Sequence, residues 1–197
     1  MPDTSYDLEL DLTEAKHMVN SLENYVRQED LYYKISTYLP ILTMGGFLLR
    51  VRRLYQFEDQ LLPEQLEIFQ DVQSKHMQIR DEWRYHYTQK LLTEIKSRLN
   101  VIQYYLNECD EAPQFCQEHY RPEAFRRTLI QEILYAIKYL QPDQTSAIEN
   151  LISYVDNRLR PLLDSTYFLW DDRLKPVYPS KEFWWLYSQP LVENAMN

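Results

Sequence analysis

The chain has 197 residues, enough for one domain of ordinary size. It contains only two glycines and almost no segment that alternates apolar and polar residues, which argues against a β-sheet fold and predicts an all-α one. The formal net charge of −9 argues against a nucleic-acid partner, because a protein that binds the phosphate backbone needs a basic face.

The sequence contains no pattern typical of a membrane or secreted protein. No basic segment followed by an apolar one opens the sequence, so we expect no secretory signal. The longest uncharged run, residues 35–49, is shorter than the roughly 20 residues that span a bilayer. The two cysteines are interpreted as reduced thiols, which indicates a cytoplasmic protein.

Two helices are predicted before the first proline of the interior. The first begins at Asp11, which can cap it, and buries a stripe of Ala15, Met18, Leu22, Tyr25 and Val26. The second begins at Asp30 and ends or kinks at Pro40, because proline removes a helical donor.

Both glycines lie in the apolar run that follows. Glycine is costly in a helix, so Gly45 and Gly46 indicate a close helix crossing, a break after Pro40, or a backbone opening that lines a pocket. If there is a pocket, aromatic and imidazole side chains further along the chain could complete it. The candidate pocket residues are Gly45, Gly46, His76, Trp83 and His86.

One long helix is predicted over residues 63–109, since no glycine or proline interrupts residues 64–112. Its apolar residues form two seams that are out of phase and join near Trp83, where we expect a straight or slightly bent section and a change of partners. The pairs Asp71/Lys75 and Glu94/Arg98 are interpreted as the wet outer face. The predicted fold is therefore an all-α antiparallel bundle built around this helix.

Two more helices and an arm complete the chain. Pro122 is predicted to open a helix that faces Phe125 inward, and a further helix from Asp143 or Thr145 faces Leu151 inward and ends at Pro161. The rest is rich in proline and aromatic residues and is predicted to be an irregular arm. We expect one domain, with a bundle over residues 1–160 and the arm, residues 161–197, packed on it.

No pattern assigns a catalytic, cofactor or metal site. Glu14-x-x-His17 is half of a di-iron motif without its second half, and His17 is expected at the surface. Cys109, Cys116 and His119 have unusual spacing for zinc and no second pair, although a metal or a disulfide there stays open.

Two hypotheses for function remain. The first is a non-enzymatic protein–protein interaction subunit or regulator whose arm either closes its own bundle or binds another protein or a second copy. The second is a helical-bundle enzyme or a small-ligand or metal-binding protein with the pocket near Gly45/Gly46 and Trp83/His86. The residues that would bind a partner are Phe183, Trp184, Trp185 and Tyr187.

Overall fold

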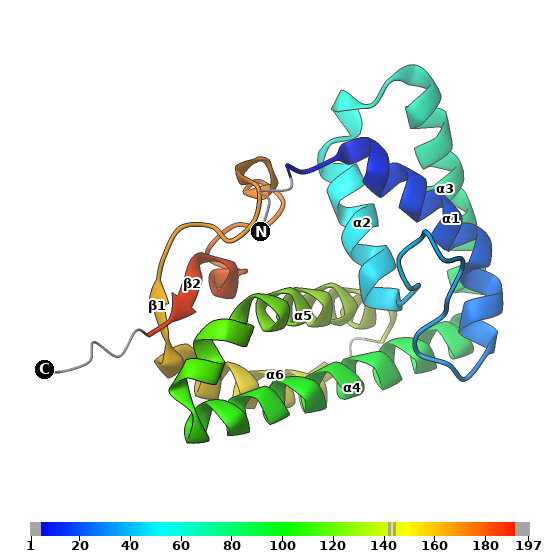
Figure 1. Cartoon of the computed structure of the whole chain (residues 1–197). Coiled ribbons are helices and arrows are strands. Elements are labelled where there is room, and N and C mark those ends of the chain that lie inside the picture. The colour runs from blue at the N-terminus through cyan, green and yellow to red at the C-terminus, as the bar shows by residue number, and fades with distance from the viewer. Residues whose placement is uncertain (1–4, 142, 144, 192–197) are drawn as a thin grey trace, which may run out of the picture. The chain divides into compact units, whose positions relative to one another are not determined.

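The computed structural model describes residues 5–141, 143 and 145–191, and it confirms the predicted all-α fold (Figure 1). The helices are α1 (Leu8–Arg27), α2 (Met44–Gln56), α3 (Pro63–Glu82), α4 (Arg84–Glu111), α5 (Pro113–Leu140) and α6 (Thr145–Leu159). The 3-10 turns η1 (Glu58–Gln60), η3 (Arg160–Leu162), η4 (Asp172–Leu174) and η5 (Trp184–Tyr187) and the short strands β1 (Leu163–Ser165) and β2 (Ser188–Pro190) complete the described elements.

The contacts divide the chain into two compact units, and the boundary falls inside α4. The N-terminal unit is Ser5–Glu94, and the C-terminal unit takes in the chain from Ile95 onward. The arm therefore groups with the second half of α4, α5 and α6. The expectation of a single domain with a bundle over residues 1–160 stays a prediction.

In the N-terminal unit, α1 packs against both α2 and α3. Its predicted stripe is confirmed, because Ala15, Met18, Leu22, Tyr25 and Val26 are all buried. The predicted cap is wrong: Asp7 caps α1 by accepting a hydrogen bond from the Leu10 N–H at 3.0 Å. Asp11 is instead buried within α1 and pairs with Arg53 of α2 at 3.5 Å.

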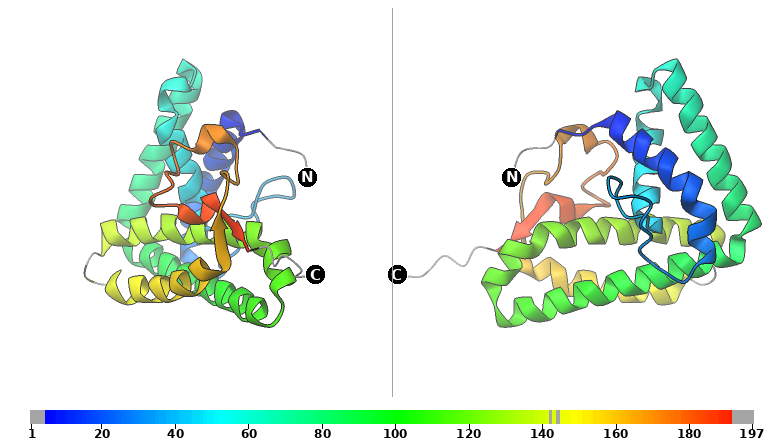
Figure 2. Two further views of the ribbon diagram at one scale, coloured as in Figure 1. Left: turned by 90° about the vertical axis from the view of Figure 1, so that its left-hand side faces the viewer. Right: turned by 45° about the vertical axis from the view of Figure 1, so that its right-hand side comes forward.

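The prediction of one helix over residues 63–109 is wrong, because the chain turns at Trp83 between α3 and α4. Trp83 has φ −105° and ψ 29°, so it ends α3 while its carbonyl accepts the Tyr87 N–H at 2.9 Å. Figure 2 shows the change of direction between α3 and the first turns of α4. The break falls where the two apolar seams meet out of phase, so a turn lets each seam find its own partners.

The predicted helix over residues 30–39 is also wrong. Residues 28–43 form an irregular loop, closed by an isolated antiparallel bridge in which Tyr33 and Leu42 exchange backbone hydrogen bonds of 3.0 and 2.8 Å. At the start of the loop, the backbone carbonyls of Gln28 and Asp30 accept hydrogen bonds from the Lys90 ammonium instead of from helical N–H groups. This tertiary satisfaction of the backbone removes the need for a helix.

In the C-terminal unit, the second half of α4 is followed by α5 and α6, which reverse direction in turn (Figure 1). The predicted seam is confirmed where Ile95, Leu99, Ile102 and Leu106 are buried. Helix α5 begins at Pro113, so the predicted start at Pro122 is wrong and Pro122 lies inside the helix on an exposed face.

Two side chains predicted to face inward do not. Phe125 on α5 is 41% exposed, and Leu151 on α6 is 42% exposed. Phe125 lies instead at the edge of the arm, where its ring meets that of Trp170 with centroids 6.1 Å apart. The core on α5 is carried by Leu129, Ile130, Ile133 and Ile137.

Candidate functional site

The two glycines lie in the first turn of helix α2, and the carboxylate of Glu94 caps the N-terminus of that helix. The backbone N–H of Met44 donates to Glu94 at 2.7 Å, that of Gly45 donates to Glu94 at 3.1 Å, and that of Gly46 donates to Thr43 Oγ1 at 3.0 Å. The interpretation of Glu94/Arg98 as a wet face is wrong, because the two side chains are 0% and 5% exposed. A buried anion at a helix N-terminus is stabilised by the free N–H groups and the helix dipole.

The imidazole and indole residues of the predicted pocket lie in the same unit. The ring of Phe47, next to Gly46, meets His76 edge-on with centroids 4.9 Å apart, and His76 Nε2 shares a 2.8 Å hydrogen bond with the Tyr87 hydroxyl. Trp83 lies against His86, with centroids 5.7 Å apart, and beneath the Arg27 guanidinium at 4.5 Å.

Protein groups bond the His76 imidazole and the N–H groups at the start of α2, whereas the buried Trp83 Nε1 has no hydrogen-bond partner among the described residues. Burial, with a smaller contribution from Arg80, lowers the pKa of His76 to about 4, so its imidazole is neutral at pH 7. Gly45 and Gly46 are buried, whereas His86 is exposed. That a ligand enters here stays a prediction.

Cys109 and Cys116 are free, buried thiols in the C-terminal unit. The Tyr105 hydroxyl lies 3.0 Å from Cys116 Sγ and donates to the Cys116 carbonyl at 2.9 Å. His119 is exposed, lies 3.0 Å from the Phe115 carbonyl and stacks on the Phe115 ring. Within residues 5–141, 143 and 145–191, no group of three or more His, Cys, Asp and Glu side chains could hold a metal ion.

The aromatic arm is folded onto α5 of its own unit. Phe183 and Trp185 are buried, and Trp185 Nε1 donates to Thr128 Oγ1 at 3.0 Å while Tyr120 donates to the Trp185 carbonyl at 2.6 Å. Trp184 and Tyr187 keep partial exposure. Whether the arm also binds a partner stays a prediction, which now rests on these two side chains.

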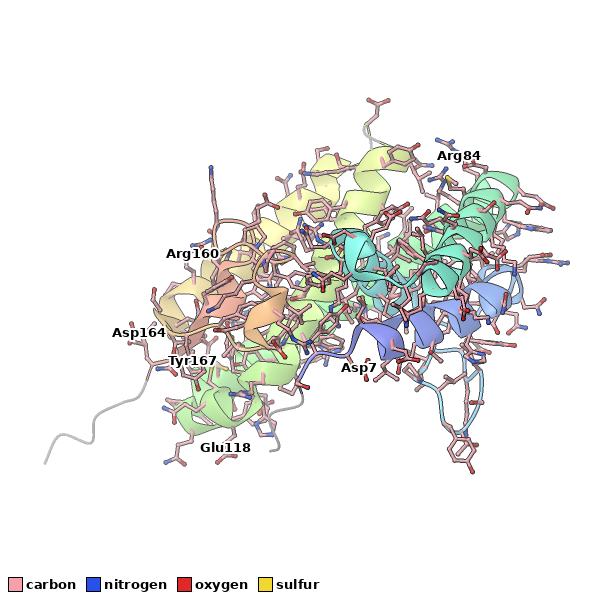
Figure 3. All side chains as sticks on the ribbon, turned by 90° about the horizontal axis from the view of Figure 1, so that it is seen from above. Asp7, Arg84, Glu118, Arg160, Asp164 and Tyr167 are labelled. Carbon is pink, nitrogen blue, oxygen red and sulfur yellow. The ribbon has the colours of Figure 1, made fainter. Side chains whose placement is uncertain are left out.

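Trp184 and Tyr187 also line a pocket of about 240 Å³ that lies wholly within the C-terminal unit. Arg160, which is labelled in Figure 3, lines this pocket together with residues from the first part of the arm. The residues that line it are Arg160, Leu163, Ser165, Ser180, Trp184, Tyr187 and Ser188.

Sequence reasoning missed Arg160 and the exposed loop between α1 and α2. Tyr38, Tyr32 and Ile41 of that loop are 96%, 51% and 53% exposed, but the apolar spacing from Leu31 to Leu39 imitated a helix. Pro40 and the cluster of three tyrosines were the available signal for a loop.

Comparison with known proteins adds no family: no family model, curated protein or solved structure matches the chain. Across the described part of the chain, every helix is too short or too polar to cross a bilayer.

Proposed function

We propose that the protein is a cytoplasmic, non-enzymatic interaction subunit that binds another protein through residues 28–43, which we name the tyrosine loop. The observation that carries this proposal is the exposure of Tyr38, which at 96% is almost complete. Tyr32 and Ile41 are half-exposed on the same loop. Tyrosine is enriched among the residues that dominate binding at protein interfaces.

The tyrosine loop is held firmly at its base. Lys90 Nζ, on α4, donates to the carbonyls of Gln28 at 2.5 Å and Asp30 at 2.8 Å, and it lies 4.5 Å from the centre of the Tyr25 ring. The Tyr25 hydroxyl donates to the Leu31 carbonyl at 3.0 Å. A loop fixed in advance loses little conformational entropy on binding, which favours affinity.

The length and charge of the tyrosine loop support the same function. Irregular segments this long are uncommon in compact units and are usually functional. Glu29 and Asp30 are exposed beside the aromatic side chains, and the whole chain carries a net charge of −9. The partner that fits is a protein surface with an apolar pocket and a basic rim, and not a nucleic acid.

Site-specific photo-crosslinking in the cells of origin tests the proposal. The full chain carries a photoreactive phenylalanine analogue in place of Tyr38, and the matched control carries it in place of Tyr85, which is 71% exposed in the same unit. We expect one discrete crosslinked product from position 38 and none from position 85. The mass of the product distinguishes a second copy of this chain from a different protein.

Two further variants link the product to the loop. Combining Tyr32→Ala and Ile41→Ala should reduce the crosslink yield at position 38 by removing neighbouring contact area. Lys90→Met should also reduce it, because the loop loses the cation that holds two of its carbonyls. Diffuse labelling at position 38, or the same product from both positions, would show that the loop is not the binding segment.

A further inference from the structure

An arginine guanidinium stacks on the ring of each of the two adjacent tryptophans of the arm. The guanidinium carbon of Arg127 lies 4.0 Å from the ring centroid of Trp185, and that of Arg160 lies 3.9 Å from the ring centroid of Trp184. An arginine stacked in this way uses the face of its guanidinium and keeps the N–H groups at its edge free to donate.

Arg127, the buried arginine of the two, also pairs with a carboxylate. Arg127 donates from Nε and Nη2 to the two carboxylate oxygens of Asp156, at 2.8 and 2.9 Å. This fork-to-fork pairing is the geometry in which a guanidinium binds a planar oxyanion most strongly. Its side chain is only 3% exposed, so the pair is internal to the unit.

Arg160, the exposed arginine of the two, has no such carboxylate partner among the described residues. Arg160 is exposed, and its guanidinium forms no ion pair or hydrogen bond with residues 5–141, 143 and 145–191. It lines the 240 Å³ pocket instead of pairing with a carboxylate. The arginine stacked on Trp185 therefore has a carboxylate partner, whereas the arginine stacked on Trp184 has none among the described residues.

Hydroxyl groups line the pocket beside Arg160. Strands β1 and β2 pair so that Ser165 stands opposite Ser188, and alternation along the strand places Leu163 on the same side as Ser165. Ser188 donates to the Trp184 carbonyl at 2.9 Å, which fixes the turn that carries Trp184. Ser180 adds another hydroxyl from the segment before that turn.

We propose that this pocket binds a small organic anion whose carboxylate or phosphate group pairs with the free edge of Arg160. Ser165 and Ser180 would donate to the same oxyanion, and Leu163 and Trp184 supply an apolar wall for the rest of the ligand. The volume of about 240 Å³ lies below the roughly 300–1,000 Å³ of pockets for drug-sized molecules, so the ligand that fits is a smaller one. This site uses none of the residues of the tyrosine loop, so it stands independently of the proposed function.

Isothermal titration calorimetry on the full chain tests the site. The probes are inorganic phosphate and succinate, with uncharged succinamide as the matched control for succinate. We expect saturable binding of one ligand per chain for at least one of the two anions, and none for succinamide. Which anion binds more tightly distinguishes a phosphate site from a carboxylate site.

Variants assign the binding to Arg160. Arg160→Gln should weaken the anion by roughly tenfold or more, because a charge-assisted pair is lost. Arg160→Lys should restore only part of the affinity, since an ammonium cannot pair bidentately. The control is Arg173→Gln, which removes an exposed cation of the same arm that already pairs with Asp171 at 3.3 Å, and it should bind as the parent does.

Three results would overturn the proposal. They are the absence of saturable binding of either anion, binding that Arg160→Gln leaves unchanged, and an equal loss in Arg173→Gln. Because Arg160 is exposed, its substitution should leave the thermal midpoint within about 2 °C of the parent, which separates lost binding from lost folding.

Discussion

The carboxylate of Glu94 accepts a hydrogen bond of 2.7 Å from the backbone N–H of Met44, fifty positions earlier in the chain. This contact, with the neighbouring one from Gly45, attaches the first turn of α2 to α4. Both glycines are buried in this first turn, and a Cβ at Gly46 would lie 3.0 Å from Thr43 Oγ1, the atom that accepts the Gly46 N–H.

Glu94→Ala should lower the free energy of unfolding by about 2–4 kcal/mol, because two buried N–H groups lose a charged acceptor. Urea unfolding followed by circular dichroism measures the loss. Glu67→Ala, which removes an exposed glutamate of α3, is the control and should change stability by less than about 0.5 kcal/mol. Equal stability of the two variants would contradict the capping role.

His76 should make stability depend on pH. Its pKa is about 4 in the folded chain and about 6.5 when unfolded, so the unfolded state binds a proton that the native state excludes. The stability that the neutral imidazole contributes is complete above pH 6.5 and is lost as pH falls toward 4. Because His76 keeps some exposure, we expect a loss of about 1–2 kcal/mol between pH 7 and pH 5.

The measurement compares the parent chain with His76→Gln, whose stability should fall less over the same pH range because the titrating group is gone. His17→Gln removes an exposed histidine and should follow the parent curve. Parallel curves for the parent and His76→Gln would show that burial does not depress the pKa of His76.

Trp185→Ala should destabilise the C-terminal unit by about 3–5 kcal/mol, since it leaves a cavity beside α5 and removes the ring beneath Arg127. Urea unfolding measures the free energy, and limited proteolysis should show cleavage within the arm. The control is Tyr167→Ala, because Tyr167 is 70% exposed in the same arm. An unchanged unfolding midpoint for Trp185→Ala would mean that the arm is not docked on α5.

Cys109 and Cys116 should react slowly with a thiol reagent in the native protein. Burial raises the pKa of the Cys109 thiol to about 12, so almost none of it is present as the reactive thiolate at pH 8. Ellman's reagent should label both cysteines rapidly in denaturant and much more slowly without it. Fast, complete labelling of the native chain would show that these thiols are accessible.

The sequence alone was enough to predict the class of fold and the main apolar stripes. The scarcity of glycine and the helical spacing of apolar residues predicted an all-α protein, and the stripes on α1 and on the second half of α4 are buried as expected. It also located the point, near Trp83, where two seams change phase. These features are local, because periodicity along one helix is set by which face meets the core.

The positions where helices break and the burial of particular charged side chains depend on contacts between distant parts of the chain. A phase change could mean a slight bend or a turn, and contacts such as the His76–Tyr87 hydrogen bond accompany the turn. Glu94 and Lys90 are charged residues of the kind usually found on a solvated helix face, yet both are buried. Glu94 accepts from the backbone N–H of Met44, and Lys90 donates to the backbone carbonyl of Gln28. A single helix carries no record of such distant partners, so its pattern cannot distinguish a buried charge from a solvated one.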